Sequence, residues 1–77
     1  MPEIVIYTRT TCAPCRAVKM WLKSKGFTFS EKNVDEDPKL VDEIIKRTGV
    51  MQVPMTLIGD TAVSGQNFSL LSKTLML

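Results

Sequence analysis

Two cysteines, Cys12 and Cys15, are the only thiols in the 77 residues, and Ala13 and Pro14 separate them. Thiols at this spacing can form a structural disulfide, supply two ligands to a metal ion, or act as a redox pair that exchanges with other disulfides. The composition and the neighbouring residues indicate which of these three kinds of chemistry to expect.

The composition disfavours a metal site and a purely structural disulfide. The sequence has no histidine and no further cysteine, so zinc would need two carboxylate ligands, which are unusual in structural zinc sites. A disulfide that closes a loop of about four residues contributes at most about 2 kcal/mol through chain entropy. We therefore expect no metal within one chain. An iron–sulfur cluster shared between two subunits stays an alternative, because two chains together offer four thiolates.

A redox pair needs one thiolate that attacks a disulfide and a second thiol within reach. The sequence predicts a helix that starts at Cys12, where unpaired N–H groups and the helix dipole stabilise an anion, and Cys15 follows one turn later. Lowering a thiol pKa from about 8.5 to about 7 takes about 2 kcal/mol, more than an exposed helix terminus usually supplies. The S–H of Cys15 and a cation, Arg9 or Arg16, are candidates for the remainder. Alternatively, both arginines are solvated surface residues.

The segments before and after the cysteines predict a strand and a helix. Residues 4–7 (IVIY) are uninterrupted and β-rich, which is typical of a strand buried on both faces. Behind Cys15, three apolar residues recur at helical spacing, and Gly26 ends the helix. We interpret Trp21 as part of this apolar face. The three residues are Val18, Trp21 and Leu22.

Residues 27–34 (FTFSEKNV) alternate apolar and polar side chains and predict a second strand, which ends in the acidic run 35–37. We interpret that run as a solvated loop in which Asp37 caps a helix with Pro38 at its first position. This helix is expected to end near residue 48, at Gly49. Its predicted buried stripe consists of Leu40, Val41, Ile44 and Ile45.

The last third of the sequence predicts a hairpin and a short helix. Residues 55–58 and 61–63 flank a Gly-Asp turn, and the pair Ser64 and Gly65 ends the second strand. Asn67 is a plausible cap for a final helix. The apolar residues of that helix are Phe68, Leu71 and Leu75.

The predicted element order is β-α-β-α-β-β-α, which belongs to the α/β class. The first β-α-β unit pairs two parallel strands through a right-handed crossover, and the hairpin adds two antiparallel strands. We expect a four-stranded mixed sheet flanked by three helices. Cys12 then lies beyond the carboxyl end of the first strand, where α/β folds commonly carry their chemistry.

The overall composition excludes several classes of function. With 44% hydrophobic and 23% charged residues, residues 1–77 are expected to form a single globular domain. A net charge of +2, with both signs intermixed, argues against nucleic-acid binding. No apolar run approaches 18 residues and no leader pattern is present, so we expect a cytoplasmic protein that does not bind membranes, and a monomer.

From residue 4 to about residue 71 the sequence resembles the glutaredoxin family of the thioredoxin fold. The segments that carry the resemblance are IYTRTTCAPC, KSKGF, NVDED, GVMQVP and LIGDTAVSG. The resemblance implies a thiol–disulfide oxidoreductase without a bound cofactor, in which Cys12 is the attacking nucleophile and Cys15 the resolving thiol. Its partners would be a disulfide-containing protein and a source of electrons, either thioredoxin reductase with NADPH or glutathione.

The resemblance also implies a substrate-binding region around the cysteines. The Val53-Pro54 bond should be cis and lie against the cysteines, which leaves the N–H and C=O of Val53 free to pair with an extended substrate. Thr11 is either a turn residue or a hydrogen-bond partner of a sulfur or the substrate. The full set of expected substrate contacts is Arg9, Thr11, Ala13, Pro14, Val53, Pro54, Gly65, Gln66 and Asn67.

Two subfamilies compete for this sequence. Glutathione-using glutaredoxins usually have Tyr inside the C-x-x-C motif and an acidic residue near the last helix, where this chain has Gln66 and Asn67. NrdH-type redoxins, which donate electrons to ribonucleotide reductase, are similar in Arg9 and in the Gly-Asp turn, although Val63 and Gln66 stand where they often carry Trp and Phe. We predict an NrdH-like protein, with a glutathione-dependent glutaredoxin as the alternative.

Overall fold

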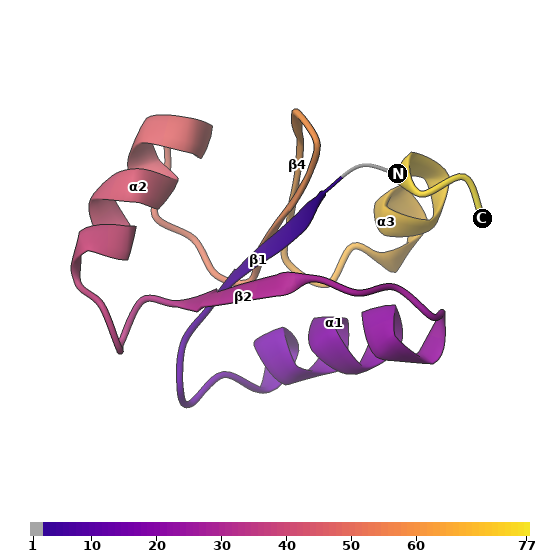
Figure 1. The fold of residues 1–77 in the computed structure, drawn as a ribbon, viewed down its shortest axis with the longest axis horizontal. Coiled ribbons are helices and arrows are strands. Elements are labelled where there is room, and N and C mark those ends of the chain that lie inside the picture. The colour runs from indigo at the N-terminus through magenta and orange to yellow at the C-terminus, as the bar shows by residue number, and fades with distance from the viewer. Residues whose placement is uncertain (1–2) are drawn as a thin grey trace.

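The computed structural model describes residues 3–77 and contains seven elements in the predicted order (Figure 1). The two predicted hairpin strands and the first strand agree with the structure to within one residue at each end. The elements are β1 (Ile4–Thr8), α1 (Ala13–Ser24), β2 (Ser30–Asn33), α2 (Lys39–Thr48), β3 (Met55–Ile58), β4 (Thr61–Ser64) and α3 (Phe68–Thr74).

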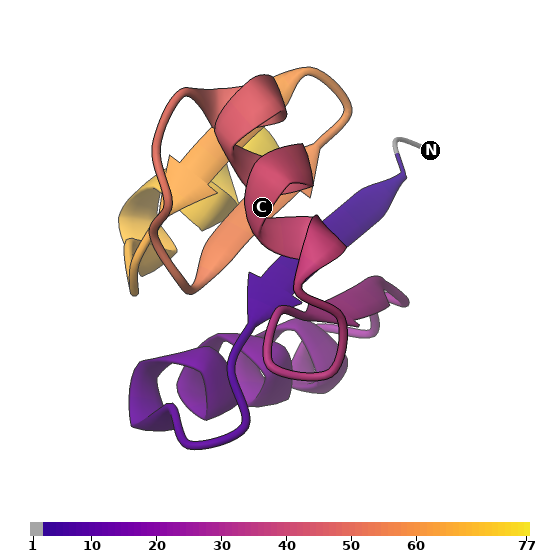
Figure 2. The ribbon, with the colours of Figure 1, turned by 90° about the vertical axis from the view of Figure 1, so that its left-hand side faces the viewer.

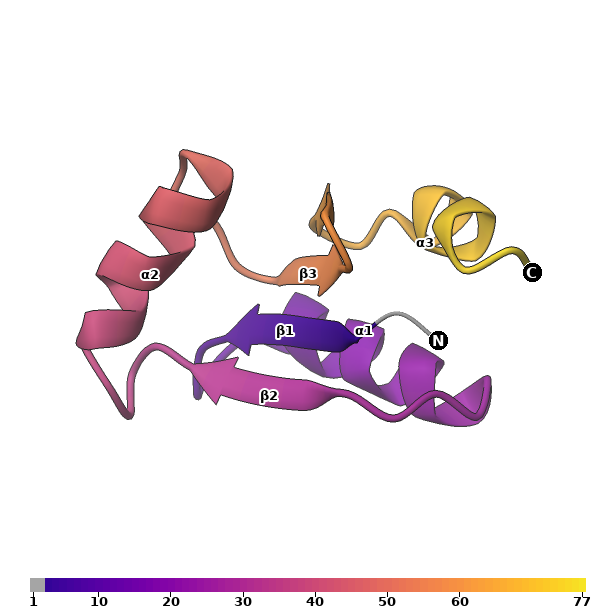
Figure 3. The same cartoon turned by 45° about the horizontal axis from the view of Figure 1, so that its top comes forward.

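The strands form one mixed sheet in the order β2-β1-β3-β4. β1 is parallel to β2 and antiparallel to β3, and β3 is antiparallel to β4. Figure 3 shows the arrows of β1 and β2 pointing the same way and that of β3 pointing back. The predicted α/β fold is confirmed, and it places the carboxyl ends of β1 and β2 at one edge of the sheet.

Two apolar clusters cover the two faces of the sheet. Ile4 and Ile6 of β1 join a cluster with side chains of α1 and α3, while Val5 and Tyr7 join a cluster with Ile44 of α2. Figure 2 views the molecule from the side of α2. All five residues of β1 are buried, as the apolar run 4–7 predicted. Within residues 3–77, no helix is long and apolar enough to cross a membrane.

The second strand is shorter than predicted. The sequence pattern predicted a strand over residues 27–34, but β2 begins only at Ser30. Phe27 and Phe29 precede it and pack, partly buried, against the cluster beneath α1 and α3. Their alternation therefore reflects burial, while the backbone ladder with β1 starts at the pair Val5 and Ser30. Trp21 packs partly buried against the same cluster, as expected.

The end of α2 agrees with the prediction, but its start does not. Pro38 occupies the cap position, and Oδ1 of Asp37 accepts a hydrogen bond from the N–H of Lys39 at 3.1 Å, so the helix begins one residue later than predicted. Gly49 closes it with φ = 85°, a left-handed conformation that glycine adopts at little cost.

The predicted buried stripe of α2 is wrong at Ile45. Ile44 is 0% exposed, and Leu40 and Val41 are partly buried against the same cluster, but Ile45 is 43% exposed. Successive helical residues differ by about 100° in direction. Ile44 takes the central position of the buried face, and the step to the next residue turns Ile45 towards solvent.

This difference predicts unequal costs for two otherwise identical truncations. Ile44→Ala removes a fully buried side chain and should lower the free energy of unfolding by about 2–5 kcal/mol. Ile45→Ala, the matched control on the neighbouring residue, should cost less than about 1 kcal/mol. Urea denaturation followed by tryptophan fluorescence measures both values. Equal destabilisation by the two variants would contradict the helix orientation described above.

Candidate active site

Cys12 is the N-cap residue of α1. Its backbone is extended (φ = −148°, ψ = 99°), and its Sγ accepts a hydrogen bond from the N–H of Cys15 at 3.1 Å. Pro14 lies in the first turn of α1, where its missing N–H leaves no helical hydrogen bond unmade. Cys12 thus lies where the helix presents unpaired N–H groups, as the sequence predicted.

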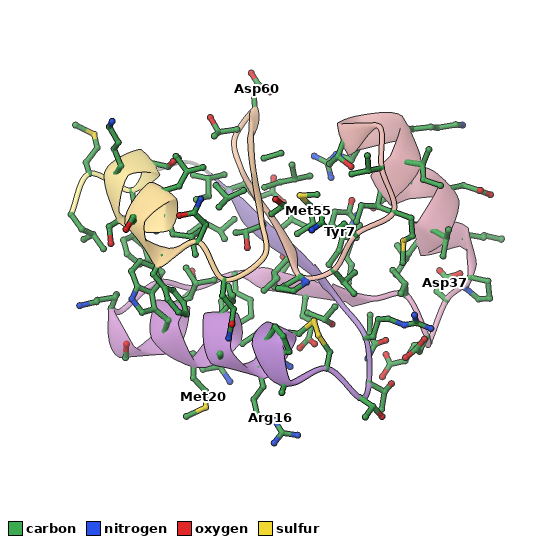
Figure 4. All side chains as sticks on the ribbon, turned by 180° about the vertical axis from the view of Figure 1, so that it is seen from behind. Tyr7, Arg16, Met20, Asp37, Met55 and Asp60 are labelled. Carbon is green, nitrogen blue, oxygen red and sulfur yellow. A yellow bond between two sulfur atoms is a disulfide. The ribbon has the colours of Figure 1, made fainter. Side chains whose placement is uncertain are left out.

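The two cysteines form a disulfide with a Cα–Cα distance of 5.2 Å. Figure 4 shows this bond in yellow beside the start of α1. Cys15 is 1% exposed, whereas Cys12 is half-buried. Of the two cysteines, only Cys12 therefore has partial access to solvent, and the buried Cys15 lies within one helical turn of it.

Two further loops reach the same edge of the sheet as Cys12. Met55 is in register with Tyr7, so Pro54 lies level with the carboxyl end of β1. The Val53-Pro54 bond is cis, which confirms that prediction. The N–H of Gly65 donates to the carbonyl of Pro54 at 2.9 Å and brings the end of β4 to this edge. Three loops that are distant in sequence therefore converge here.

The segment before Pro54 has backbone groups without hydrogen-bond partners and two exposed apolar side chains. Among residues 3–77, neither the N–H nor the C=O of Val53 has a hydrogen-bond partner. Val50 and Met51 are 49% and 38% exposed. This segment has the features of a strand edge that can accept an extended peptide.

Several of the remaining predicted contact residues lie on the surface. Thr11, Ala13 and Gln66 are exposed. Asn67 is exposed as well, and its Oδ1 accepts a hydrogen bond from the N–H of Leu70 at 3.1 Å, which confirms it as the cap of α3. Thr11 makes no hydrogen bond to a sulfur within residues 3–77, which fits its interpretation as a turn residue.

Neither arginine is placed to stabilise a thiolate strongly. Nε of Arg9 pairs with Oδ1 of Asp35 at 3.2 Å, so a carboxylate compensates its charge. Arg16 is exposed and points away from the sheet on the outer side of α1 (Figure 4). Stabilisation of a Cys12 thiolate is therefore assigned mainly to the helix N-terminus and the N–H of Cys15.

The acidic loop after β2 contains a contact that sequence reasoning missed. Oδ2 of Asp35 accepts the backbone N–H of Thr10 at 2.9 Å, and Nδ2 of Asn33 donates to Oγ1 of Thr10 at 3.2 Å. The hydrogen bond from Thr10, together with Arg9, lowers the pKa of Asp35. The sequence could have indicated this contact, because β1 and β2 were predicted to be parallel. The residues that follow two parallel strands meet at one edge of the sheet.

A second polar contact supports the carboxyl end of β1 on its α1 side. The buried hydroxyl of Thr8 donates to Oε2 of Glu31 at 2.7 Å, and Nζ of Lys19 donates to the same oxygen at 2.9 Å. Partial burial alone would raise the pKa of Glu31, but the hydrogen bonds from Thr8 and Lys19 outweigh it, and the pKa is lowered. The carboxylate form is therefore the one that this contact stabilises.

On the α2 side, the hydroxyl of Tyr7 connects β1 to the helix. It donates to Oε2 of Glu43 at 2.5 Å and accepts from Nη1 of Arg47 at 3.1 Å. Lys32 also donates to Glu43, at 2.7 Å. Burial, followed by the bond to Glu43, raises the pKa of Tyr7, whereas the hydrogen bonds from Lys32 and Tyr7 lower that of Glu43. Both faces of β1 are thus held by polar contacts next to the site.

The lowered pKa of Glu31 predicts an acid dependence of stability. Its contribution is fully present above the ordinary glutamate pKa of about 4.3 and is lost as the pH falls through the folded-state value. Glu31→Gln should therefore be less stable than the parent at neutral pH, and the gap should narrow below about pH 4. Urea denaturation across this pH range measures the gap.

Glu36→Gln is the matched control for this experiment, because the Glu36 side chain has no hydrogen bond within residues 3–77. Its free energy of unfolding should equal that of the parent protein at every pH. A constant gap between Glu31→Gln and the parent, from neutral to acidic pH, would contradict the assigned contact.

The comparisons with known proteins agree with this geometry. The family model described as Glutaredoxin matches residues 4–63. The chain belongs to the glutaredoxin family. It is therefore a thiol–disulfide oxidoreductase that works through a C-x-x-C pair, and members of this family generally hold no bound cofactor.

Individual relatives include proteins named glutaredoxin and proteins named NrdH. The glutaredoxin-like protein NrdH of Salmonella typhimurium is 40% identical over 63 residues, which are 82% of this chain and 76% of that protein. A glutaredoxin of Pseudomonas aeruginosa is 40% identical over 65 residues, 84% of this chain and 77% of the relative.

A solved structure gives the same result for the fold. The NrdH-redoxin of Escherichia coli, described as having a thioredoxin-like activity profile, superimposes with a TM-score of 0.80 at 34% identity and covers 92% of both chains. The thioredoxin-like fold and the NrdH-like glutaredoxin resemblance are both confirmed. Within residues 3–77, no group of three or more His, Cys, Asp or Glu side chains could hold a metal ion.

Proposed function

We propose that this chain reduces disulfides of a protein partner, with Cys12 as the attacking nucleophile and Cys15 as the resolving thiol. The observation that carries the proposal is the half-buried Cys12 at the N-terminus of α1, whose Sγ accepts a hydrogen bond from the N–H of Cys15. An N–H directed at sulfur stabilises the thiolate more than the thiol. The buried Cys15 is within reach but shielded from solvent.

The reaction follows from thiol–disulfide exchange. The Cys12 thiolate attacks one sulfur of the substrate disulfide, forms a mixed disulfide, and releases the other substrate sulfur as a thiolate that takes up a proton. Cys15 then loses its proton and attacks the Sγ of Cys12, which releases the second substrate thiolate. Two electrons pass to the substrate, and the Cys12–Cys15 disulfide seen in the structure remains.

The substrate is proposed to bind along the segment that precedes Pro54. Its extended backbone would pair with the free N–H and C=O of Val53, as in strand addition. Exposed Val50 and Met51 offer apolar contacts on the same segment. Further contacts are proposed for Arg9, Thr11, Ala13, Pro14, Pro54, Gly65, Gln66 and Asn67.

We propose thioredoxin reductase with NADPH as the reductant, and the disulfide of ribonucleotide reductase as a fitting target for an NrdH-like protein. The ammonium group of glutathione would find Gln66 and Asn67 where a carboxylate would serve it better, because charge-assisted hydrogen bonds are about twice as strong as neutral ones. Residues 1–77 are proposed to act as a single, monomeric domain in the cytoplasm, where thiols are kept reduced.

Cys12→Ser and Cys15→Ser test the two proposed roles. In an insulin reduction assay, Cys12→Ser should abolish turnover, because serine is not a nucleophile towards disulfides at neutral pH. Cys15→Ser should accumulate a mixed disulfide between Cys12 and the substrate, visible by mass spectrometry. Undiminished turnover of Cys12→Ser would end the proposal. A mixed disulfide formed through Cys15 would reverse the two roles.

The reductant is tested by comparing NADPH-driven turnover through thioredoxin reductase with turnover driven by glutathione and glutathione reductase. The reductase route should be faster, and Asn67→Asp should shift the ratio towards glutathione by several-fold, about 1 kcal/mol, while its side chain still caps α3. Ser69→Asp, which adds a charge to the same helix end, is the control. Faster turnover with glutathione in the parent protein would identify a glutathione-dependent glutaredoxin. An iron–sulfur cluster shared between two subunits stays the less favoured alternative.

A further inference from the structure

We propose that Asp35 is a positioning residue for Cys12, acting as a clamp on the loop between β1 and α1. The proposal rests on the proposed role of Cys12 as the nucleophile. Asp35 follows β2 and lies 23 positions after Cys12 in the sequence, yet both of its carboxylate oxygens bind the loop that leads to Cys12.

The two carboxylate oxygens are used by consecutive loop residues. Oδ2 accepts the backbone N–H of Thr10 at 2.9 Å, and Oδ1 accepts Nε of Arg9 at 3.2 Å. Asp35 is itself held in place, because its N–H donates to Oδ1 of Asn33 at 2.9 Å. Asn33 adds the third contact through Oγ1 of Thr10, at 3.2 Å.

These hydrogen bonds connect residues 9–11 of the loop to the end of β2 and the segment after it. Among residues 3–77, every hydrogen bond that ties residues 9–11 to another segment ends on Asn33 or Asp35. The other end of the loop is fixed by Cys12 as the N-cap of α1, through its sulfur and through its carbonyl, which accepts the N–H of Arg16 at 3.1 Å. Without Asp35, the only hydrogen bond left between residues 9–11 and another segment within residues 3–77 would be the one from Asn33 to Thr10.

The clamp acts on Cys12 by geometry and also by charge. Thr10 N–H is only two residues from Cys12, so a shift of Thr10 moves the backbone that aims the sulfur. Asp35 also compensates the charge of Arg9, which leaves the stabilisation of a Cys12 thiolate to the helix N-terminus. The neighbouring acidic residue Glu36 differs, since its side chain makes no hydrogen bond or ion pair with the loop within residues 3–77.

The test compares Asp35→Ala and Asp35→Asn with Glu36→Ala. Asp35→Ala removes both loop contacts and should lower kcat/KM for insulin reduction roughly ten- to a hundredfold, since small misplacements of a reacting group cost this much. The loss of the carboxylate leaves the charge of Arg9 uncompensated and favours the Cys12 thiolate, so the pH–rate profile should shift to lower pH. The Thr10 amide should exchange faster with solvent. Asp35→Asn keeps an oxygen for the Thr10 N–H and should recover most of the rate. Glu36→Ala should match the parent protein in all three measurements.

A folded Asp35→Ala with the parental rate and pH profile would overturn the clamp, and so would equal losses in Asp35→Ala and Glu36→Ala. If Asp35→Ala does not fold, Asp35→Glu takes its place. Its extra methylene displaces the carboxylate at unchanged charge, so a shifted profile is expected and a parental profile would overturn the proposal. Activity in Cys12→Ser would instead refute the proposed function, whereas an inactive Cys12→Ser beside a parental Asp35→Ala would refute the clamp alone.

Discussion

The burial of β1 on both faces is the constraint on which the rest of this small protein depends. Its five residues, Ile4–Thr8, are all buried, and the side chains of the first four alternate between the two apolar clusters. A slip by one residue would exchange the two faces, so the register with β2 and β3 is strongly specified. Because that register fixes where β1 ends, it also fixes where the loop to Cys12 begins.

The site uses backbone geometry where larger enzymes often use charged side chains. Cys12 gains an N–H from Cys15 and the N-terminus of a helix of 12 residues, while Arg9 is paired with Asp35 and Arg16 points outward. This part of the site needs only the local folding of α1. The parts that come from elsewhere are the proposed substrate edge at Val53 and the proposed clamp at Asp35, and the pairing of β3 and β2 with β1 brings both to the edge of the sheet where β1 ends.

Much of the fold and the two cysteines could be predicted from the sequence, because these features leave short-range patterns. The apolar run of β1, the caps at Asn67 and Gly49 and the C-x-x-C spacing are all local signals. The errors arose where tertiary burial decides: Phe27 and Phe29 pack in the core without joining the ladder, and Ile45 faces solvent beside a buried Ile44. Periodicity indicates that a face exists but does not give its width.

The missed role of Asp35 has a different origin. Its three-residue acidic run looked like solvated loop, and Asp35 is indeed partly exposed. Its contacts with Arg9 and Thr10 join residues that are 26 and 25 positions apart, so no local pattern records them. They follow only once β1 and β2 are known to be parallel and their ends to coincide. In this sheet, the residues at and just after the end of β2 therefore contact the loop that leads from β1 to Cys12, and the proposed clamp depends on that contact.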